Sequence, residues 1–165
     1  MRSRTLRLGL CAIALLLLGA CAGPESREPA PKFTVTTLAG ETFTRESLKG
    51  KVVLMQFWTT WCGYCRGEQP MVDALNKEFS GKGLVVLAVD VGESRQTVQQ
   101  YLDRSPRSCR IALNEDSNLA ESFDVTGFPV YVAIDRDGNI AGMQRGAGGE
   151  QSLRNLLSRA GLESE

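Results

Sequence analysis

Two cysteines separated by two residues, Cys62 and Cys65, are the side chains of this chain whose types and spacing point most directly to chemistry. They directly follow Trp61 and come shortly after an apolar stretch at residues 52–58. Cysteines at this spacing can close a disulfide within one helical turn. A helix that begins at Cys62 would stabilise a thiolate there through its unpaired backbone N–H groups and its dipole. A strand, a Cys-x-x-Cys turn and a helix together are typical of a dithiol redox centre.

The same spacing can also hold a metal ion, so the two interpretations have to be compared. A structural zinc site takes four nitrogen or sulfur ligands, usually as two pairs. The chain has no histidine and no second Cys-x-x-Cys pair, and beyond the N-terminal segment only Cys109 remains as a further thiol. We therefore favour redox chemistry over a metal site or an inert disulfide, and we expect no cofactor besides the Cys62–Cys65 disulfide. Cys109, just before a short apolar run, is predicted to be a buried structural thiol.

The N-terminus carries the features of an export signal. Three arginines precede an apolar run at residues 8–20, and no acidic residue occurs before Glu25. Such a run is too short to span a bilayer and is typical of a signal peptide. It ends in Leu-Gly-Ala followed by Cys21, which resembles a bacterial lipobox, in which the cysteine carries lipid and begins the mature protein. Ordinary secretory cleavage with an incidental Cys21 is the alternative.

Removal of residues 1–20 leaves 16 basic and 19 acidic residues, a net charge near −3. Without a basic run the mature chain has no electrostatic footprint for nucleic acid. Residues 21–32 contain three prolines and several charges and predict a semi-extended tether, which at about 3 Å per residue spans roughly 30 Å. Residues 33–162 then form one domain, in keeping with a mature chain of about 145 residues.

Hydrophobic periodicity predicts alternating strands and helices in that domain. The fully apolar strand at residues 84–90 is of the kind buried on both faces of a parallel sheet. Asp137-Gly138 predicts a hairpin between two late strands. The predicted strands are 33–37, 41–43, 51–58, 84–90, 111–113, 130–134 and 140–144. The predicted helices are 62–79, 94–104 capped by Ser94, 117–123 capped by Ser117, and 151–159.

Two separate motifs resemble those of one family. The segment around the cysteines is similar to that of thioredoxins and, more closely, of TlpA-like and ResA-like thiol:disulfide oxidoreductases, which are bacterial and envelope-anchored. It reads Phe57-Trp58-Thr59-Thr60-Trp61-Cys62-Gly63-Tyr64-Cys65-Arg66-Gly67-Glu68-Gln69-Pro70. A second motif runs from Phe123 to Pro129 and is followed by a strand and Asp-x-x-Gly. The resemblance covers residues 33–157. It implies an α/β thioredoxin fold, a mixed central sheet with helices on both faces, with an N-terminal β-hairpin and a helix–strand insertion near residues 94–113.

The geometry at the helix start and the resemblance together assign roles to the candidate site residues. Cys62 is predicted to be the attacking thiolate, with a pKa well below the ~8.5 of a free thiol, and Cys65 resolves the mixed disulfide. The resemblance implies that Trp61 and Pro129 bind substrate, since Pro129 resembles the cis-proline that faces the disulfide in this fold.

The proton acceptor of the reaction is the least conventional part of the prediction. Thioredoxin carries a buried Asp six residues before its first active-site cysteine, and Gln56 stands at that position here. The TlpA-like branch places an acid three residues after the second cysteine, where this chain has Glu68. On a helix Glu68 lies on the same side as the cysteine pair, so we predict that it accepts a proton. A solvated helix charge is the alternative.

ResA-like proteins are reductants that a membrane thiol-electron donor of the CcdA/DsbD type supplies, and they reduce apocytochrome c before haem attachment. The resemblance thus implies a monomeric reductant of protein disulfides. Lipid on Cys21 would hold it on the outer face of the cytoplasmic membrane or on the outer membrane, facing the periplasm. The insert Gly63-Tyr64 instead resembles that of periplasmic disulfide isomerases, so an isomerase or oxidant is the alternative. A non-enzymatic adaptor or metal carrier would be marked by loss of a cysteine, and both are present.

Overall fold

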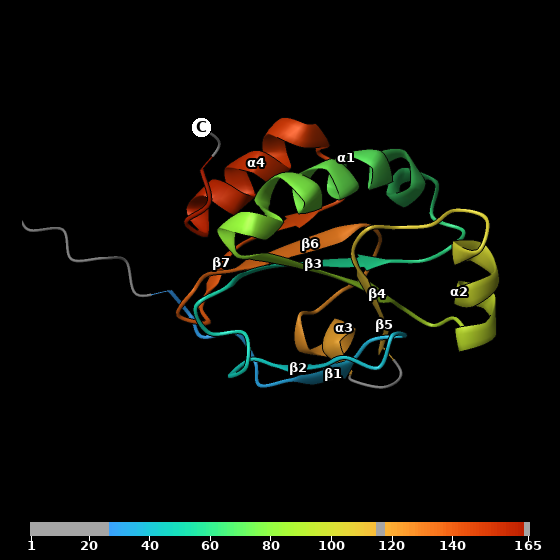
Figure 1. The fold of residues 1–165 in the computed structure, drawn as a ribbon, viewed down its shortest axis with the longest axis horizontal. Coiled ribbons are helices and arrows are strands. Elements are labelled where there is room, and N and C mark those ends of the chain that lie inside the picture. The colour runs from blue at the N-terminus through green and yellow to red at the C-terminus, as the bar shows by residue number, and fades with distance from the viewer. Residues whose placement is uncertain (1–26, 115–117, 164–165) are drawn as a thin grey trace, which may run out of the picture.

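The structure, a computed structural model, describes residues 27–114 and 118–163 (Figure 1). The predicted signal peptide at residues 1–20 and the predicted lipidation site Cys21 lie outside the described residues. Within the described ranges, none of the helices has the length and apolar character that crossing a bilayer requires.

A five-stranded mixed sheet with the strand order β5-β4-β3-β6-β7 forms the centre of the molecule. The central strand β3 pairs in parallel with β4 and antiparallel with β6, while β5 and β7 form the edges. All seven residues of both β3 and β4 are buried, which explains why their sequences are almost entirely apolar. The strands are β3 (Val52–Trp58), β4 (Leu84–Asp90), β5 (Arg110–Leu113), β6 (Val130–Ile134) and β7 (Ile140–Arg145).

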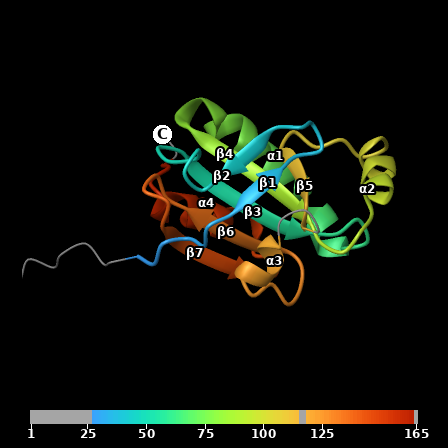
Figure 2. The same cartoon turned by 90° about the horizontal axis from the view of Figure 1, so that it is seen from below.

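Helices and a hairpin cover both faces of this sheet (Figures 1 and 2). One face carries α1 (Gly63–Phe79) and α4 (Gly149–Arg159), and the other carries α3 (Leu119–Ser122) with the antiparallel hairpin β1 (Thr34–Thr36) and β2 (Thr42–Thr44). The remaining helix, α2 (Arg95–Leu102), lies beyond the β5 edge. A single 3₁₀ turn, Ser80–Lys82, follows α1. The arrangement confirms the predicted α/β fold with its N-terminal hairpin and its helix–strand insertion.

Alternation of side chains along the strands separates two apolar cores. Leu54 and Trp58 of β3 point toward α1 and α4, whereas Met55 and Phe57 point toward α3 and the hairpin. Gln56 shares the face of Leu54 and Trp58, so an uncharged polar side chain stands within the core beneath α1.

The helix starts differ in how well the sequence predicted them. Ser94 caps α2 as predicted, because its Oγ accepts a hydrogen bond from the Thr97 amide at 3.2 Å. The prediction for α3 is wrong at its start: the helix is preceded by Asn118, which has φ = 50° and makes no side-chain cap, while Ser117 lies outside the described residues. Asn tolerates this left-handed conformation better than most residues, so the helix can begin without a Ser cap.

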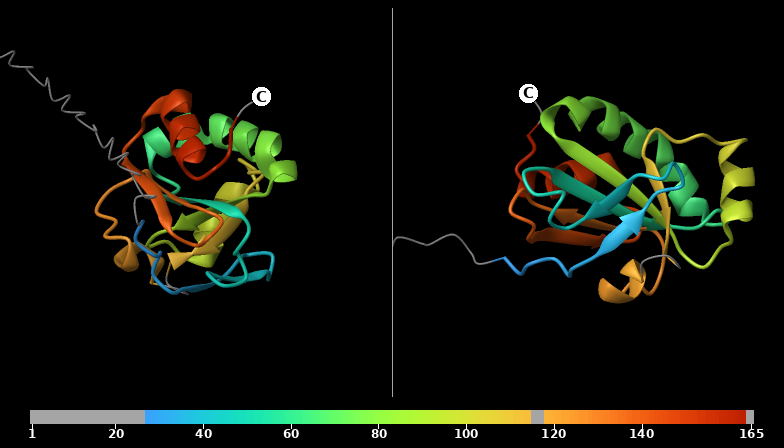
Figure 3. Two further views of the ribbon diagram at one scale, coloured as in Figure 1. Left: turned by 90° about the vertical axis from the view of Figure 1, so that its left-hand side faces the viewer. Right: turned by 60° about the horizontal axis from the view of Figure 1, so that its bottom comes forward.

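The last part of the predicted tether is attached to the domain. Residues 27–30, here called the N-terminal strap, run along the start of β7 (Figure 3). The Ile140 amide donates to the Glu28 carbonyl at 2.8 Å, the Ala30 amide donates to the Gly138 carbonyl at 3.0 Å, and Ala30 is 1% exposed. Pro29 still keeps the strap extended, but the strap's backbone groups bind to the domain, which therefore begins before residue 33.

Candidate active site

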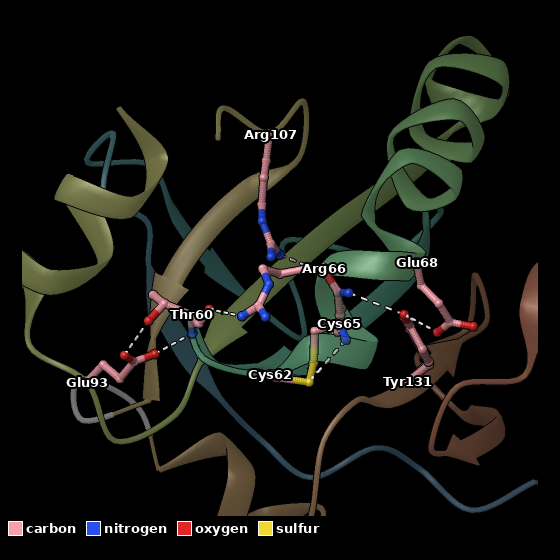
Figure 4. The surroundings of a disulfide bond; sticks show 9 residues. Thr60, Cys62, Cys65, Arg66, Glu68, Glu93, Arg107 and Tyr131 are labelled. Carbon is pink, nitrogen blue, oxygen red and sulfur yellow. Dashed lines mark hydrogen bonds between the residues drawn. A yellow bond between two sulfur atoms is a disulfide. The ribbon is translucent and has the colours of Figure 1, made fainter. Parts of the chain in front are cut away.

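The two cysteines form a disulfide at the start of α1, directly after the loop that leaves the central strand β3 (Figure 4). Their Cα atoms lie 5.3 Å apart. Cys62 is the N-cap of α1, and its Sγ accepts a hydrogen bond from the Cys65 amide at 3.1 Å. The helix start therefore directs at the Cys62 sulfur a backbone N–H group that has no acceptor within the helix, as the sequence predicted. After reduction this donor and the helix dipole favour a thiolate on Cys62.

The two sulfurs differ in accessibility. Cys62 keeps a small exposed fraction of 5%, whereas Cys65, in the first turn of α1, is fully buried. Thiol–disulfide exchange needs collinear approach of an outside sulfur to one member of the pair. The geometry assigns this outside contact to Cys62 and leaves Cys65 as the inner, resolving cysteine.

Aromatic side chains surround the accessible sulfur. Trp61 and Tyr64 are the exposed large hydrophobic residues of the described chain, at 66% and 74%. The Trp61 ring meets Phe128 edge-on, with ring centroids 5.9 Å apart, and the Phe128–Pro129 peptide bond is cis. The fold thus joins two motifs that are more than sixty residues apart in sequence. Trp61, next to Cys62, thus contacts the residue that precedes Pro129, and the substrate-binding role of Trp61 and Pro129 stays a prediction.

Glu68 lies inside the protein rather than on a solvated helix surface, because only 8% of it is exposed. The alternative of a solvated charge is therefore wrong. Its carboxylate accepts three hydrogen bonds, from the Tyr131 hydroxyl at 2.8 Å and from the Gly148 and Gly149 amides at 3.0 and 2.8 Å. Two of these donors belong to the start of α4, where a negative charge is favoured. Glu68 thus joins α1 to α4, and its role as proton acceptor stays a prediction.

A chain of polar side chains runs through the core beneath the disulfide. Gln56 donates through Nε2 to the Tyr131 hydroxyl at 3.3 Å and accepts through Oε1 from Arg107 Nη1 at 3.3 Å. Tyr131 in turn donates to Glu68. Burial, with the Glu68 carboxylate next, raises the pKa of Tyr131 above its usual range, so the hydroxyl keeps its proton. The chain therefore connects a cation, two neutral groups and an anion.

A second polar group holds the loop that precedes Cys62. Glu93 accepts from the Thr60 amide at 2.5 Å and from the Thr60 hydroxyl at 2.6 Å. On the other side, Arg66 donates to the Thr60 carbonyl at 2.9 Å. Asp90, which lies opposite Trp58 in the sheet, is 1% exposed, and burial followed by the neighbouring Glu93 raises its pKa to about 8. A buried, protonated carboxyl thus stands beside the loop at neutral pH.

Sequence reasoning missed Arg107, Tyr131, Asp90 and Glu93. A single tyrosine in an aliphatic strand and an aspartate ending a fully apolar strand were the available signals. Cys109 is free and 8% exposed, which confirms that it is a buried thiol, and burial raises its pKa to about 11. A thiol with that pKa stays protonated and unreactive at neutral pH.

A disulfide at the start of the helix after the central strand of a thioredoxin fold, with one accessible sulfur, defines a thiol-disulfide oxidoreductase. The chain belongs to the Redoxin family, whose sequence pattern matches residues 25–157.

Named relatives agree with this assignment. The chain is 27% identical over 135 residues to the thiol-disulfide oxidoreductase ResA of Bacillus thuringiensis subsp. konkukian (strain 97-27). The matched stretch covers 82% of this chain and 78% of that protein. It is 28% identical over 153 residues to ResA of Bacillus subtilis (strain 168), covering 90% and 86%. A solved thiol:disulfide interchange protein of the thioredoxin family from Chlorobium tepidum TLS superposes with a TM-score of 0.73 at 26% identity, covering 84% and 99%. The predicted resemblance to ResA-like oxidoreductases is thereby confirmed.

Proposed function

We propose that the protein is an extracytoplasmic reductant of protein disulfides that acts at a membrane surface, anchored through lipid on Cys21. One observation carries the redox role: the Cys62 sulfur is accessible at the start of α1, while Cys65 is buried behind it. A partner protein can therefore reach the pair through Cys62 alone. The exposed rings of Trp61 and Tyr64 give an unfolded or extended partner chain an apolar surface beside that sulfur.

The reaction transfers two electrons in two exchange steps. The Cys62 thiolate attacks a partner disulfide, so that one Cys62–partner bond forms, the partner's own S–S bond breaks and one partner thiolate leaves. Cys65 then loses its proton and attacks the Cys62 sulfur, which closes the Cys62–Cys65 disulfide and releases the second partner thiolate. Two protons accompany the two electrons to the partner. A membrane thiol-electron donor of the CcdA/DsbD type then reduces the pair again.

The relatives named ResA support the reducing direction and, by the family resemblance, apocytochrome c as a substrate. The insert between the cysteines supports a second candidate, a disulfide isomerase or oxidant. Tyr64 stands at 74% exposure next to the disulfide, and the insert Gly63-Tyr64 has no proline. Changes in this dipeptide shift the reduction potential over roughly 100 mV or more in related proteins.

The reduction potential of the Cys62–Cys65 pair, measured by equilibration with glutathione, separates the two candidates. A reductant should lie near the about −270 mV of thioredoxin, and an isomerase near about −180 mV. The partner exchange is tested with Cys65→Ser, which should accumulate a mixed disulfide on Cys62, while Cys62→Ser should form none. Cys109→Ser is the matched control and should leave both results unchanged. Mixed disulfides that form equally on Cys62→Ser would show that the redox centre lies elsewhere.

Anchoring is tested independently of the redox chemistry. Cys21→Ser should release the protein from membranes and abolish metabolic labelling with fatty acid. Cys11→Ser, which changes a cysteine inside the predicted signal peptide, should do neither. A Cys21→Ser protein that still sediments with membranes would show that another segment anchors the chain.

A further inference from the structure

Arg107 lies in the loop between α2 and β5, within the helix–strand insertion, and its side chain points into the core. The guanidinium carbon stands 3.4 Å from the centroid of the Trp58 ring, and Nη1 donates to Gln56 Oε1 at 3.3 Å. Figure 4 shows Arg107 reaching from this loop toward the first turn of α1, where Cys65 lies. Trp58 and Cys65 are both fully buried and belong to the same core cluster. The loop thus places a cation on Trp58 and Gln56, in the core that also holds Cys65.

Arg107 forms no ion pair within the described residues. Its Nε and Nη2 atoms are buried without a hydrogen-bond partner there, and Nη1 donates to the neutral Gln56 amide, while Tyr101 and Asp73 nearby also favour the charged form. Burial lowers the pKa of the guanidinium, yet an arginine stays charged in proteins. A charge kept in such a place stabilises any anion that forms nearby, because the surrounding dielectric is low.

We propose that Arg107 is a positioning residue of the exchange reaction, whose guanidinium, held between Trp58 and Gln56, stabilises the Cys65 thiolate that forms when the mixed disulfide is resolved. The proposal rests on the proposed role of Cys62–Cys65 as the redox pair and deepens it. The chain places a fixed cation near the resolving cysteine and a neutral Gln56 where thioredoxin has an acid.

The resolving step explains why a cation is useful there. Cys65 must lose its proton while it is closed off from water and while Cys62 is bonded to the partner. The Cys65 thiolate then attacks the Cys62 sulfur, the Cys62–partner bond breaks, and the partner leaves with the electron pair as a thiolate. Arg107 gives and takes no proton in this step. It lowers the free energy of the intermediate anion, so that Cys65 gives up its proton more easily.

Two of the acidic groups near Arg107, Asp90 and Cys109, carry no charge at neutral pH. Burial raises the pKa of Asp90 of β4 to about 8, so this side chain is mostly uncharged at neutral pH. Glu93 accepts hydrogen bonds from the Thr60 amide and hydroxyl. Cys109 likewise stays protonated because burial raises its pKa to about 11. The other facing groups are Tyr101 of α2, Asp73 and Arg66 of α1, and Tyr131 of β6 with its partner Glu68. Asp73 accepts hydrogen bonds from the Ser108 amide and hydroxyl and from the Gln69 amide, and its carboxylate also favours the charged form of Arg107.

The test is the pH dependence of resolution in a single turnover. The whole protein is charged on Cys62 with glutathione as a mixed disulfide, and the release of glutathione by Cys65 is followed from pH 5 to pH 10. In Arg107→Gln the midpoint of the pH–rate profile should rise by about one unit, with about a tenfold slower release at pH 7. Arg107→Lys retains the charge and should restore most of the shift.

Arg110→Gln is the matched control, since Arg110 also stacks on an aromatic ring, Phe43 at 5.4 Å, in the same insertion but on the opposite face. It should leave the profile unchanged. Arg107→Gln removes a buried charge and is expected to fold, because replacing such a group by a neutral one of similar size is often tolerated. If it does not fold, Arg107→Lys decides alone: a midpoint within about 0.3 units of the unchanged protein supports the proposal, and a full shift overturns it.

A slower release in Arg107→Gln by the same factor at every pH would also overturn the proposal, because it would show a structural role only. The redox assignment fails in a different way. If the unchanged protein releases no glutathione, or if Cys65→Ser releases it equally fast, Cys65 is not the resolving cysteine, whatever Arg107 does.

Discussion

Polar side chains near the disulfide form two hydrogen-bond networks, and Glu68 accepts hydrogen bonds from three groups in one of them. Its carboxylate accepts hydrogen bonds from Tyr131 and from the first two amides at the start of α4. A residue expected from sequence to move protons thus also holds two helices together. The two roles can be separated, because one depends on the charge and the other partly on geometry.

Glu68→Gln should therefore lower both stability and rate. We expect the free energy of unfolding, measured in urea, to fall by about 1–3 kcal/mol, since charged acceptors contribute roughly that much. Exchange with a small disulfide should slow by roughly tenfold if the carboxylate accepts the Cys65 proton. Tyr131→Phe removes one donor and leaves the charge, so it should lower stability by only about 1 kcal/mol. An unchanged pH–rate profile in Glu68→Gln would leave Glu68 with the structural role alone.

Asp90 makes the stability depend on pH. Burial raises its pKa from the usual 3.8 to about 8 in the folded protein, so the folded state binds more protons than the unfolded state between those values. The free energy of unfolding therefore falls as the pH rises from about 4 to about 8. Asp90→Asn should remove this slope, with little change near pH 4 and a gain of about 1–3 kcal/mol near pH 8.

The exposed Asp137→Asn, in the turn between β6 and β7, is the control for Asp90 and should follow the unchanged protein at every pH. The measurement is urea unfolding of the oxidised protein at half-unit steps of pH. Parallel stability curves for Asp90→Asn and the unchanged protein would contradict the protonated state of Asp90.

At the scale of elements, long periodic segments were predictable and short or irregular ones were not. The strand β4 has the predicted bounds and α1 differs by one residue, because an apolar run and an amphipathic repeat are local properties. The four-residue helix α3 offers too few turns for a period, so its start was misplaced. The strap was missed because its two backbone hydrogen bonds, with Gly138 and Ile140, and its side-chain contacts with Asp135 and Arg45 all join distant parts of the chain, which leave no local pattern in the sequence.

The strap yields a prediction about the domain boundary. A mature protein that begins at Arg27 should be as stable as one that begins at Cys21. One that begins at Lys32 loses the burial of Ala30, two backbone hydrogen bonds and the Arg27–Asp135 ion pair at 3.0 Å. It should unfold with about 1–3 kcal/mol less free energy, most of it from the buried groups, since exposed ion pairs contribute little. Equal urea midpoints for all three proteins would show that the strap detaches in solution.

At the scale of the whole molecule, the contacts that build the site join distant parts of the chain. Gln56 and Tyr131 are 75 positions apart, and Arg107 and Gln56 are 51 apart. The cysteines, Trp61 and Pro129 were predictable because a family motif records them residue by residue. The Arg107–Gln56–Tyr131–Glu68 chain was not, because it depends on which strands become neighbours and on a loop of the insertion. Local sequence patterns contain neither.

The arrangement of the whole domain also bears on the proposed membrane anchor. Strand β6 begins directly after Pro129 at the disulfide and ends before Asp135, where the strap is attached. A five-residue strand is about 17 Å long, so the chain enters the domain at the end of the sheet remote from the disulfide, as Figure 1 shows. If Cys21 carries lipid as proposed, we expect the redox site to lie on the side of the domain away from the bilayer.

This orientation can be measured with a bulky thiol reagent. The variant Cys65→Ser with Cys109→Ser keeps Cys62 as the reactive thiol of the domain. A maleimide attached to a long polyethylene glycol should modify Cys62 equally fast, within about twofold, in anchored protein on vesicles and in the form released by Cys21→Ser. The bilayer does not cover the site in this arrangement, so anchoring adds no steric barrier. A reaction at least tenfold slower on vesicles would show that the disulfide faces the lipid and that the domain folds back over its anchor.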